Sequence, residues 1–180
     1  MTALVLIDIQ KGFEDDYWGR RNNPNAEQMC ARILDVWRER QLPVIHVKHC
    51  SVSPGSPLRP ELPGNEFQDL VAPIAEESVF TKSVNSAFIG TGLQSHLDSN
   101  GVRDLVVVGL TTDHCVSTSV RMAANLGFDV TLISDATATF DRVGPDGQFY
   151  LASDIHGIHL ASLNDEFCRV KSTDAFLLDR

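Results

Sequence analysis

Short apolar runs rich in β-branched residues alternate along this chain with longer segments in which apolar residues recur at helical spacing. Near-continuous apolar runs of about four to eight residues are typical of buried parallel strands. The runs that predict strands are Ala3–Ile9, Pro43–Lys48, Val79–Ser83, Asp104–Leu110, Val130–Ile133 and, as a last edge strand, Cys168–Lys171.

The segments between these runs carry the helical pattern, and proline or glycine marks several of their ends. The predicted helices are one that starts at Pro24 and buries Cys30, Ile33, Leu34 and Trp37, one centred on Leu93–Leu97 and closed by Asn100 and Gly101, one that has Cys115 in its first turn and ends at Gly127, and one over Tyr150–Leu163. The stretch from Ser51 to Pro73 is crowded with proline and glycine, and it predicts a long ordered loop.

Strands that alternate with helices pair in parallel through right-handed crossovers, which leaves a sheet with helices on both faces. We therefore predict a three-layer α/β/α fold with a central, mostly parallel sheet. With 180 residues, of which 43% are hydrophobic, the chain can bury one sizeable core, so we predict a single domain over residues 1–180.

Charge and cysteine usage narrow the partners and the compartment. A formal charge of -9 argues against nucleic acid and anionic membranes as partners. The first apolar run lacks a cationic start and is interrupted by Asp8, and no run is long enough to span a bilayer, so a cytoplasmic location is expected. The four cysteines show no C-x-x-C pair and are expected to be separate thiols in a reducing compartment.

In a parallel sheet, ligands bind beyond the carboxyl ends of the strands, so the polar residues at those ends are the candidates for chemistry. They are Asp8, Gln10, His49, Lys82, Thr111 to Cys115, and Asp135. A thiol becomes a good nucleophile when it loses its proton. A helix start would favour the Cys115 thiolate, Lys82 would supply a positive charge, and Asp8 could accept the proton.

Three motifs of the chain resemble, in order and spacing, those of the isochorismatase-like cysteine hydrolases, a superfamily that includes nicotinamidases and N-carbamoylsarcosine amidohydrolases. The motifs are DIQKGF at residues 8–13, FTKSVNSAF at residues 80–88 and GLTTDHCV at residues 109–116. The resemblance implies a catalytic triad of Asp8, Lys82 and Cys115. It also implies a cis peptide between Leu110 and Thr111, and an oxyanion hole formed by the backbone N–H groups of Thr111 and Cys115.

The substrate pocket is expected to include Phe13 from the first loop, with Asn85 and Phe88 following Lys82. Tyr17 and Trp18 are further candidates for an apolar wall, and Arg20, Arg21 or Arg59 could bind a substrate carboxylate. Cys50 follows the second strand and could be a bystander thiol near the pocket.

No metal and no cofactor are expected. The Asp-x-His metal motif of nicotinamidases falls on His49 and Ser51 here, which is a departure from that pattern. His46 and His49 lie three positions apart on a strand and therefore point to opposite faces. His156 and His159 share one helical face, where surface or packing roles are more common than ligation.

These observations together predict a cysteine-dependent hydrolase that cleaves a small amide or ureido C–N bond through a thioester. One alternative is a vinyl-ether hydrolase of the isochorismatase type, a branch that lacks the nucleophilic cysteine. Another is a non-catalytic small-molecule-binding or assembly protein that retains the fold. The expected partner is a small-molecule substrate, and the resemblance implies a homo-oligomer.

Overall fold

The computed structural model describes residues 1–179, and its centre is a sheet of six strands that all pair in parallel. The strands lie in the order β3-β2-β1-β4-β5-β8. They are β1 (Thr2–Ile7), β2 (Val44–His49), β3 (Ser78–Lys82), β4 (Asp104–Leu110), β5 (Asp129–Ala138) and β8 (Arg169–Lys171). The order reverses direction at β1, so the carboxyl ends of β1, β2 and β4 meet at the crevice where such sheets bind ligands.

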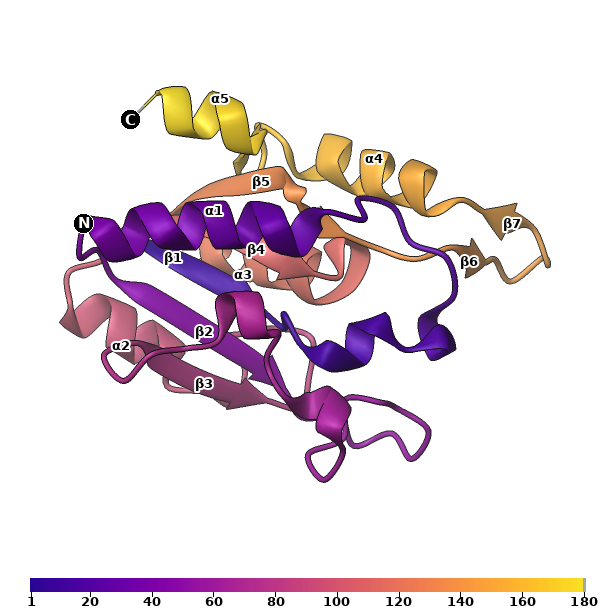
Figure 1. Ribbon diagram of the computed structural model, residues 1–180. Helices are drawn as coiled ribbons and strands as arrows, with labels where there is room; N and C mark the ends of the chain where they lie inside the picture. Colours follow the sequence, from indigo (N-terminus) through magenta and orange to yellow (C-terminus); the bar gives the residue numbers. More distant parts are fainter. Residues whose placement is uncertain (180) are drawn as a thin grey trace.

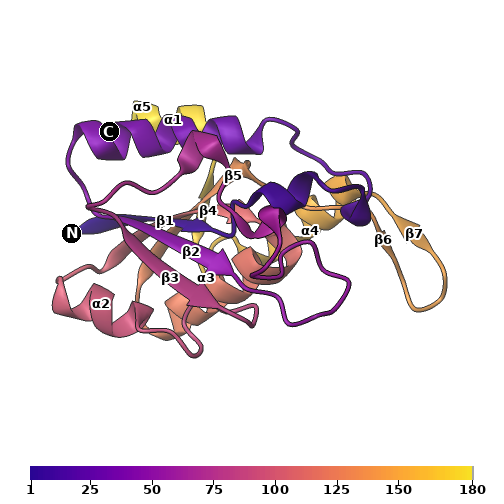
Figure 2. The same cartoon turned by 60° about the horizontal axis from the view of Figure 1, so that its bottom comes forward.

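Helices cover both faces of the sheet, as predicted (Figures 1 and 2). One face carries α1 (Ala26–Glu39) and α5 (Thr173–Leu178), while the other carries α2 (Leu93–Ser99), α3 (Ser117–Asn125) and α4 (Ala152–Leu163). Alternation along β1 explains the two cores: Leu4 and Leu6 pack under α1, whereas Val5 and Ile7 pack on the opposite side. The predicted three-layer fold is therefore confirmed.

The predicted apolar face of α1 is confirmed as well. Cys30, Ile33, Leu34 and Trp37 are all buried against the sheet. Burying a large aliphatic or aromatic side chain contributes about 1.5–3 kcal/mol, so this stripe attaches the helix firmly. The Trp37 ring also stacks on Phe176 of α5, with 5.8 Å between ring centroids.

The chain differs from the prediction where strands end. The first strand stops at Ile7 and not Ile9, because Asp8 adopts a left-handed backbone with φ of 54°. The fifth strand extends to Ala138. Its pairing with β4 shifts register between Val107 and Gly109 and then continues. A short hairpin of β6 (Arg142–Val143) and β7 (Phe149–Tyr150) was not predicted, and neither was α5.

Gly109 allows β4 to pass close to β1 immediately before Asp8. Its φ is 124°, and a Cβ atom at this position would lie 2.0 Å from the carbonyl oxygen of Ile7. Only glycine combines this backbone conformation with so close an approach. Gly109 therefore allows the third motif, residues 109–116, to lie close to the end of β1.

The predicted long loop from Ser51 to Pro73 is irregular apart from two short 3-10 turns, Pro63–Asn65 and Asp69–Val71. The loop after β1 contains two more, Lys11–Glu14 and Asp16–Trp18. None of the helices within residues 1–179 is both long enough and apolar enough to cross a membrane.

Candidate active site

Three neighbouring strands deliver polar side chains to one point at the carboxyl edge of the sheet. Asp8 directly follows β1, and its left-handed backbone is anchored by a hydrogen bond from its N–H to the Val47 carbonyl oxygen at 2.9 Å. His49 and Lys82 are the last residues of β2 and β3 and lie opposite each other in the strand register. A non-glycine residue with positive φ at a strand end is typical of functional sites.

The Lys82 ammonium lies at the centre of this group. Its Nζ donates to Asp8 Oδ2 at 2.5 Å, contacts His49 Nδ1 at 3.1 Å and donates to Cys115 Sγ at 3.2 Å. The side chains of Lys82 and Asp8 are both 0% exposed. An ammonium has three hydrogens, so three acceptors satisfy it completely.

Cys115 belongs to a π-helical turn, Thr112–Val116, that leads into α3. Such turns within helices are rare and are frequently found at functional sites. The Leu110–Thr111 peptide bond just before it is cis. The Cys115 sulfur also lies 3.8 Å from Asn85 Oδ1, so the three motif segments approach one another around this atom.

Burial dominates the electrostatics of the site. It raises the pKa of the Cys115 thiol, the Asp8 charge raises that pKa further, and Lys82 opposes both effects. Burial also raises the pKa of Asp8, with Lys82 again acting in the opposite direction. The sequence suggested that the helix start and Lys82 would favour the thiolate; Lys82 does lower this pKa, but desolvation is the larger effect. The thiol would therefore need a neighbouring base to remove its proton before the sulfur could act as a nucleophile.

Asp8 is suited to that task because one of its oxygens is unoccupied. Oδ2 accepts from Lys82, whereas the buried Oδ1 has no hydrogen-bond partner within the part of the chain that the structure describes. A raised pKa makes a carboxylate a stronger base. The Asp8 carboxylate, the Cys115 sulfur and a ring nitrogen of His49 all lie within 4.8 Å of one another.

A cavity of about 80 Å³ opens onto these groups. Its lining residues are Asp8, Phe13, Trp18, His49, Leu58, Asn85, Thr111, His114 and Cys115. The predicted pocket residues Phe13 and Asn85 are thus brought together with the cysteine, and Trp18 joins Phe13, with 4.9 Å between their ring centroids. Leu58 reaches the cavity from the long loop.

Phe88 does not lie at this cavity, although its position after Lys82 suggested that it would. The chain turns away beforehand, because the Ala87 N–H donates to Ser119 Oγ of α3 at 2.9 Å. The Phe88 ring then packs into the core and stacks on Phe128, with 6.0 Å between centroids. We therefore leave Phe88 out of the site.

The three arginines considered for carboxylate binding are all held elsewhere. The ion pairs are Arg20 with Asp141 at 3.1 Å, Arg21 with Glu27 at 2.8 Å, and Arg59 with Glu61. None of them lines the cavity. Tyr17 stands 59% exposed and is likewise outside it. No arginine within residues 1–179 lines the pocket.

Asp8, His49 and Cys115 form the only group of three potential metal-binding side chains found in residues 1–179. The Lys82 ammonium touches all three and takes the position that a cation would need. His46 points to the opposite face, as predicted, where its Nε2 bonds Glu77 at 2.8 Å. His156 bonds Thr112 Oγ1 at 2.8 Å behind the π-helical turn. Our expectation of no bound metal stays a prediction.

Two residues support the site: Gln10, a candidate from the sequence without an assigned role, and Asn65, which was not predicted. The Gln10 side chain accepts from the His49 N–H at 2.8 Å and donates to the His49 carbonyl oxygen at 3.0 Å. Asn65 Nδ2 donates to the same oxygen at 2.9 Å. Gln10 was visible as a polar residue after β1, whereas Asn65 comes from the long loop and had no sequence signal.

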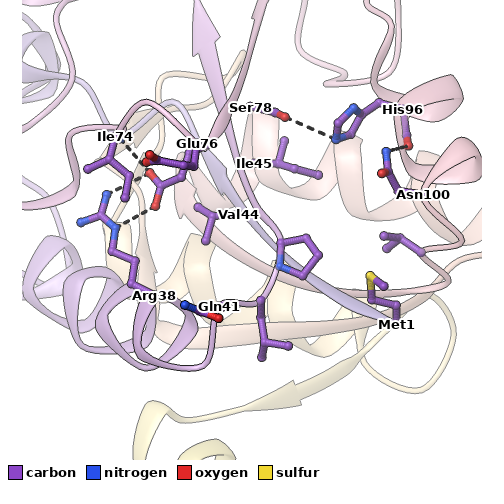
Figure 3. A pocket seen from close by; sticks show the side chains of 14 residues that line it. Met1, Arg38, Gln41, Val44, Ile45, Ile74, Glu76, Ser78, His96 and Asn100 are labelled. Carbon is purple, nitrogen blue, oxygen red and sulfur yellow. Dashed lines mark hydrogen bonds and ion pairs between the residues drawn. The ribbon is translucent and has the colours of Figure 1, made fainter.

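A larger hollow of about 600 Å³ lies at the opposite, amino edge of the sheet (Figure 3). Glu77 there is paired with Arg38 at 2.7 Å, and Ser78 bonds His96 at 3.4 Å. No cysteine or lysine is among its lining residues within the described chain. The groups capable of acyl chemistry are instead gathered at the smaller cavity.

Comparison with known proteins places this site in a family. A family model described as an isochorismatase domain matches residues 2–173. The chain belongs to the isochorismatase family. It is 46% identical over 177 residues to the uncharacterised isochorismatase family protein YrdC of Bacillus subtilis (strain 168), covering 98% of this chain and 95% of that protein.

Other members of the isochorismatase family extend the comparison to structure and activity. A solved structure of a putative hydrolase of the isochorismatase family from Chromobacterium violaceum superposes with a TM-score of 0.94, at 46% identity, over 98% of this chain and 92% of that one. The ureidoacrylate amidohydrolase RutB of Agrobacterium fabrum is 31% identical over 218 residues, which covers 99% of this chain and 93% of that enzyme. The family thus includes hydrolases that act on amide-type bonds.

Proposed function

We propose that this protein hydrolyses the C–N bond of a small, uncharged amide or ureido compound, with Cys115 as the nucleophile and a thioester as the intermediate. One observation carries the proposal. The Lys82 ammonium lies 2.5 Å from an Asp8 carboxylate oxygen and 3.2 Å from the Cys115 sulfur, in a buried site that opens onto a cavity. A carboxylate, an ammonium and a thiol in such contact are suited to acyl transfer.

In the first half of the reaction, Asp8 accepts the thiol proton as the Cys115 sulfur attacks the substrate carbonyl carbon. The ammonium of Lys82 compensates the negative charge that passes from carboxylate to sulfur. The C–N bond of the tetrahedral intermediate then breaks, and protonated Asp8 returns its proton to the departing nitrogen. The products of this half are ammonia or an amine and a Cys115 thioester.

The tetrahedral intermediate carries a negative oxygen that needs hydrogen-bond donors. We propose the backbone N–H groups of Thr111 and Cys115 for this role, since both residues line the cavity beside the sulfur. Removing one donor of this kind costs about 2.7–4 kcal/mol of barrier in a well-studied protease. Backbone donors cannot be deleted by side-chain substitution, so their contribution is tested through substrate analogues with a poorer oxyanion.

In the second half, a water molecule enters where the amine left. Asp8 accepts a proton from that water, the oxygen attacks the thioester carbon, and the Cys115 sulfur leaves as a thiol after recovering the proton. The overall reaction converts an amide and water into an acid and ammonia or an amine. No redox partner is required.

The lining of the cavity supports an uncharged substrate. Its walls are the rings of Phe13 and Trp18 with Leu58, and the exposed polar groups are those of His49, Asn85 and His114. His114 is itself 3.5 Å from Asp113, and no arginine of the described part of the chain lines the cavity. A substrate carboxylate would enter without a bidentate partner, which disfavours carboxylated substrates. The volume of about 80 Å³, small beside typical ligand pockets, favours substrates of few heavy atoms.

The experiment is an ammonia-release screen over uncharged primary amides, uncharged ureido compounds and N-carbamoyl acids. We expect turnover within the uncharged classes, total loss in Cys115→Ala, and no loss in the matched control Cys50→Ala, whose thiol lies nearby but does not line the cavity. Electrospray mass spectrometry of the quenched enzyme should detect the acyl adduct on Cys115. Retained ammonia release in Cys115→Ala would refute the mechanism and point to another nucleophile.

A further inference from the structure

We propose that His49 is a positioning residue for Lys82: its Nδ1 accepts one hydrogen of the ammonium and so holds that ammonium against Asp8 and Cys115 at the same time. The inference rests on the proposed function for the role of Lys82, and it adds a residue that none of the three sequence motifs contains. His49 lies at the end of β2, between the strands that supply the carboxylate and the lysine.

The strand register brings the two side chains together. His49 and Lys82 are directly paired between the parallel strands β2 and β3, and Nδ1 lies 3.1 Å from Nζ. The other two hydrogens of the ammonium go to Asp8 and Cys115. Without His49, one N–H of a fully buried cation would have no acceptor, and the desolvation cost of such a group is high.

The contact defines the tautomer of His49. An ammonium can only donate, so Nδ1 accepts with its lone pair and the ring proton resides on Nε2. The backbone of Val84 is a second hydrogen-bond partner of the ring. Burial, followed by the Lys82 charge, lowers the pKa of His49 to about 4, so the ring is neutral near neutral pH.

Other contacts hold the backbone of His49 in place. The buried amide of Gln10 bonds both its N–H and its carbonyl oxygen, and Asn65 donates to the same oxygen. The N–H of the next residue, Cys50, donates to the Lys82 carbonyl oxygen at 2.7 Å. Two buried polar side chains are thus committed to fixing the position of His49 relative to Lys82.

This arrangement determines where the ammonium points. Asp8 is the strongest acceptor in the group, and on its own it would draw Nζ toward the carboxylate. The acceptor at Nδ1 supplies a third fixed direction and keeps a hydrogen aimed at the sulfur. Loss of the acceptor should therefore weaken the contact between Lys82 and Cys115 more than that between Lys82 and Asp8.

The test uses two substitutions that differ in one property. His49→Asn places a carbonyl oxygen close to the position of Nδ1 and can accept the hydrogen, whereas His49→Leu has similar bulk and no acceptor. His46→Asn is the matched control, because His46 is buried on the same strand but points to the opposite face, toward Glu77.

The first readout is ¹⁵N NMR of the full protein, which reports the ring tautomer of His49 and the slowly exchanging ammonium signal of Lys82. We expect the Nε2–H tautomer and a protected ammonium in the wild type, retention of the ammonium signal in His49→Asn and His46→Asn, and its loss in His49→Leu. An Nδ1–H tautomer in the wild type, or an unchanged ammonium signal in His49→Leu, would overturn the inference.

The second readout is the rate at which iodoacetamide alkylates Cys115, measured by peptide mass spectrometry with Cys50 as internal reference. His49→Leu should slow Cys115 by about 10- to 100-fold while His49→Asn stays near the wild-type rate. Equal rates in all variants would overturn the inference and leave the proposed function intact. Should no acyl adduct form on Cys115 in the wild type, the proposed function fails, and the NMR readout alone then decides for or against the contact.

Discussion

Removing the Lys82 charge should destabilise the fold as well as stop the chemistry. In Lys82→Met the side chain keeps a similar length, but the Asp8 carboxylate loses an ammonium 2.5 Å away in a site where both side chains are 0% exposed. Breaking a buried pair by removing one partner costs about 3–5 kcal/mol. For a chain of 180 residues, each kcal/mol shifts the melting temperature by about 2–4 °C, so a drop of about 6–20 °C is expected.

The double variant Asp8→Asn with Lys82→Met supplies the control. With both charges removed, no uncompensated ion remains, so the double variant should be more stable than Lys82→Met alone. Urea unfolding followed by circular dichroism measures the free energy of unfolding of wild type, both single variants and the double variant. The reasoning is refuted if Lys82→Met has the wild-type stability, or if the double variant is less stable than Lys82→Met.

The pH dependence of Lys82→Met gives a second check on the same claim. Burial already raises the pKa of Asp8, and Lys82 is the group that opposes this rise. Without Lys82 the native state holds the Asp8 proton more tightly than the unfolded state does. The deficit relative to wild type should therefore grow with rising pH, by at most about 1.4 kcal/mol per pH unit. A deficit that shrinks with rising pH would contradict the assignment of the effect to Asp8.

Three further outcomes are expected. Gly109→Ala should lower the free energy of unfolding by about 3 kcal/mol or more in urea titrations, because the new Cβ would lie 2.0 Å from the Ile7 carbonyl oxygen; an unchanged midpoint would contradict this. Burial lowers the pKa of His156, so the native state keeps it neutral and the free energy of unfolding should fall as pH drops below about 6.5. His156→Gln should reduce that slope by at most about 1.4 kcal/mol per pH unit, and an identical slope would exclude His156 as its source. Treatment with a chelator should leave turnover unchanged, and a loss restored by zinc would show that a metal takes part.

The layered fold could be predicted because its signals are local. The run Asp104–Leu110 coincides with β4, and the stripe from Cys30 to Trp37 marks the buried face of α1. The β6–β7 hairpin was not predicted because its strands are two residues each. Phe149 is 58% exposed, so no pattern of buried residues marks the hairpin. The extension of β5 through Ser134 to Ala138 was not predicted because it depends on a register shift in the pairing of β5 with β4.

The same distinction, between local sequence signals and long-range contacts, separates the site residues that could be predicted from those that could not. Asp8, Lys82 and Cys115 could be placed together because the carboxyl ends of parallel strands meet at one edge. The role of Asn65 depends on the path of a long loop. The position of Phe88 depends on a hydrogen bond between Ala87 and Ser119. Neither feature produces a periodic pattern in the sequence. The raised pKa of the Cys115 thiol also required the structure, since the degree of desolvation is a property of the whole packed site.

The lysine of the site is carried by β3, one of the two edge strands of the sheet, which within residues 1–179 pairs with β2 alone. Outer strands held along one side open more readily than strands held along both. If β3 separates from β2 while the other five strands stay folded, the ammonium leaves with it, and the carboxylate and thiol are left together without a cation. Activity should thus be lost on mild heating before the fold as a whole unfolds. A catalytic assay would then report whether β3 is paired with β2.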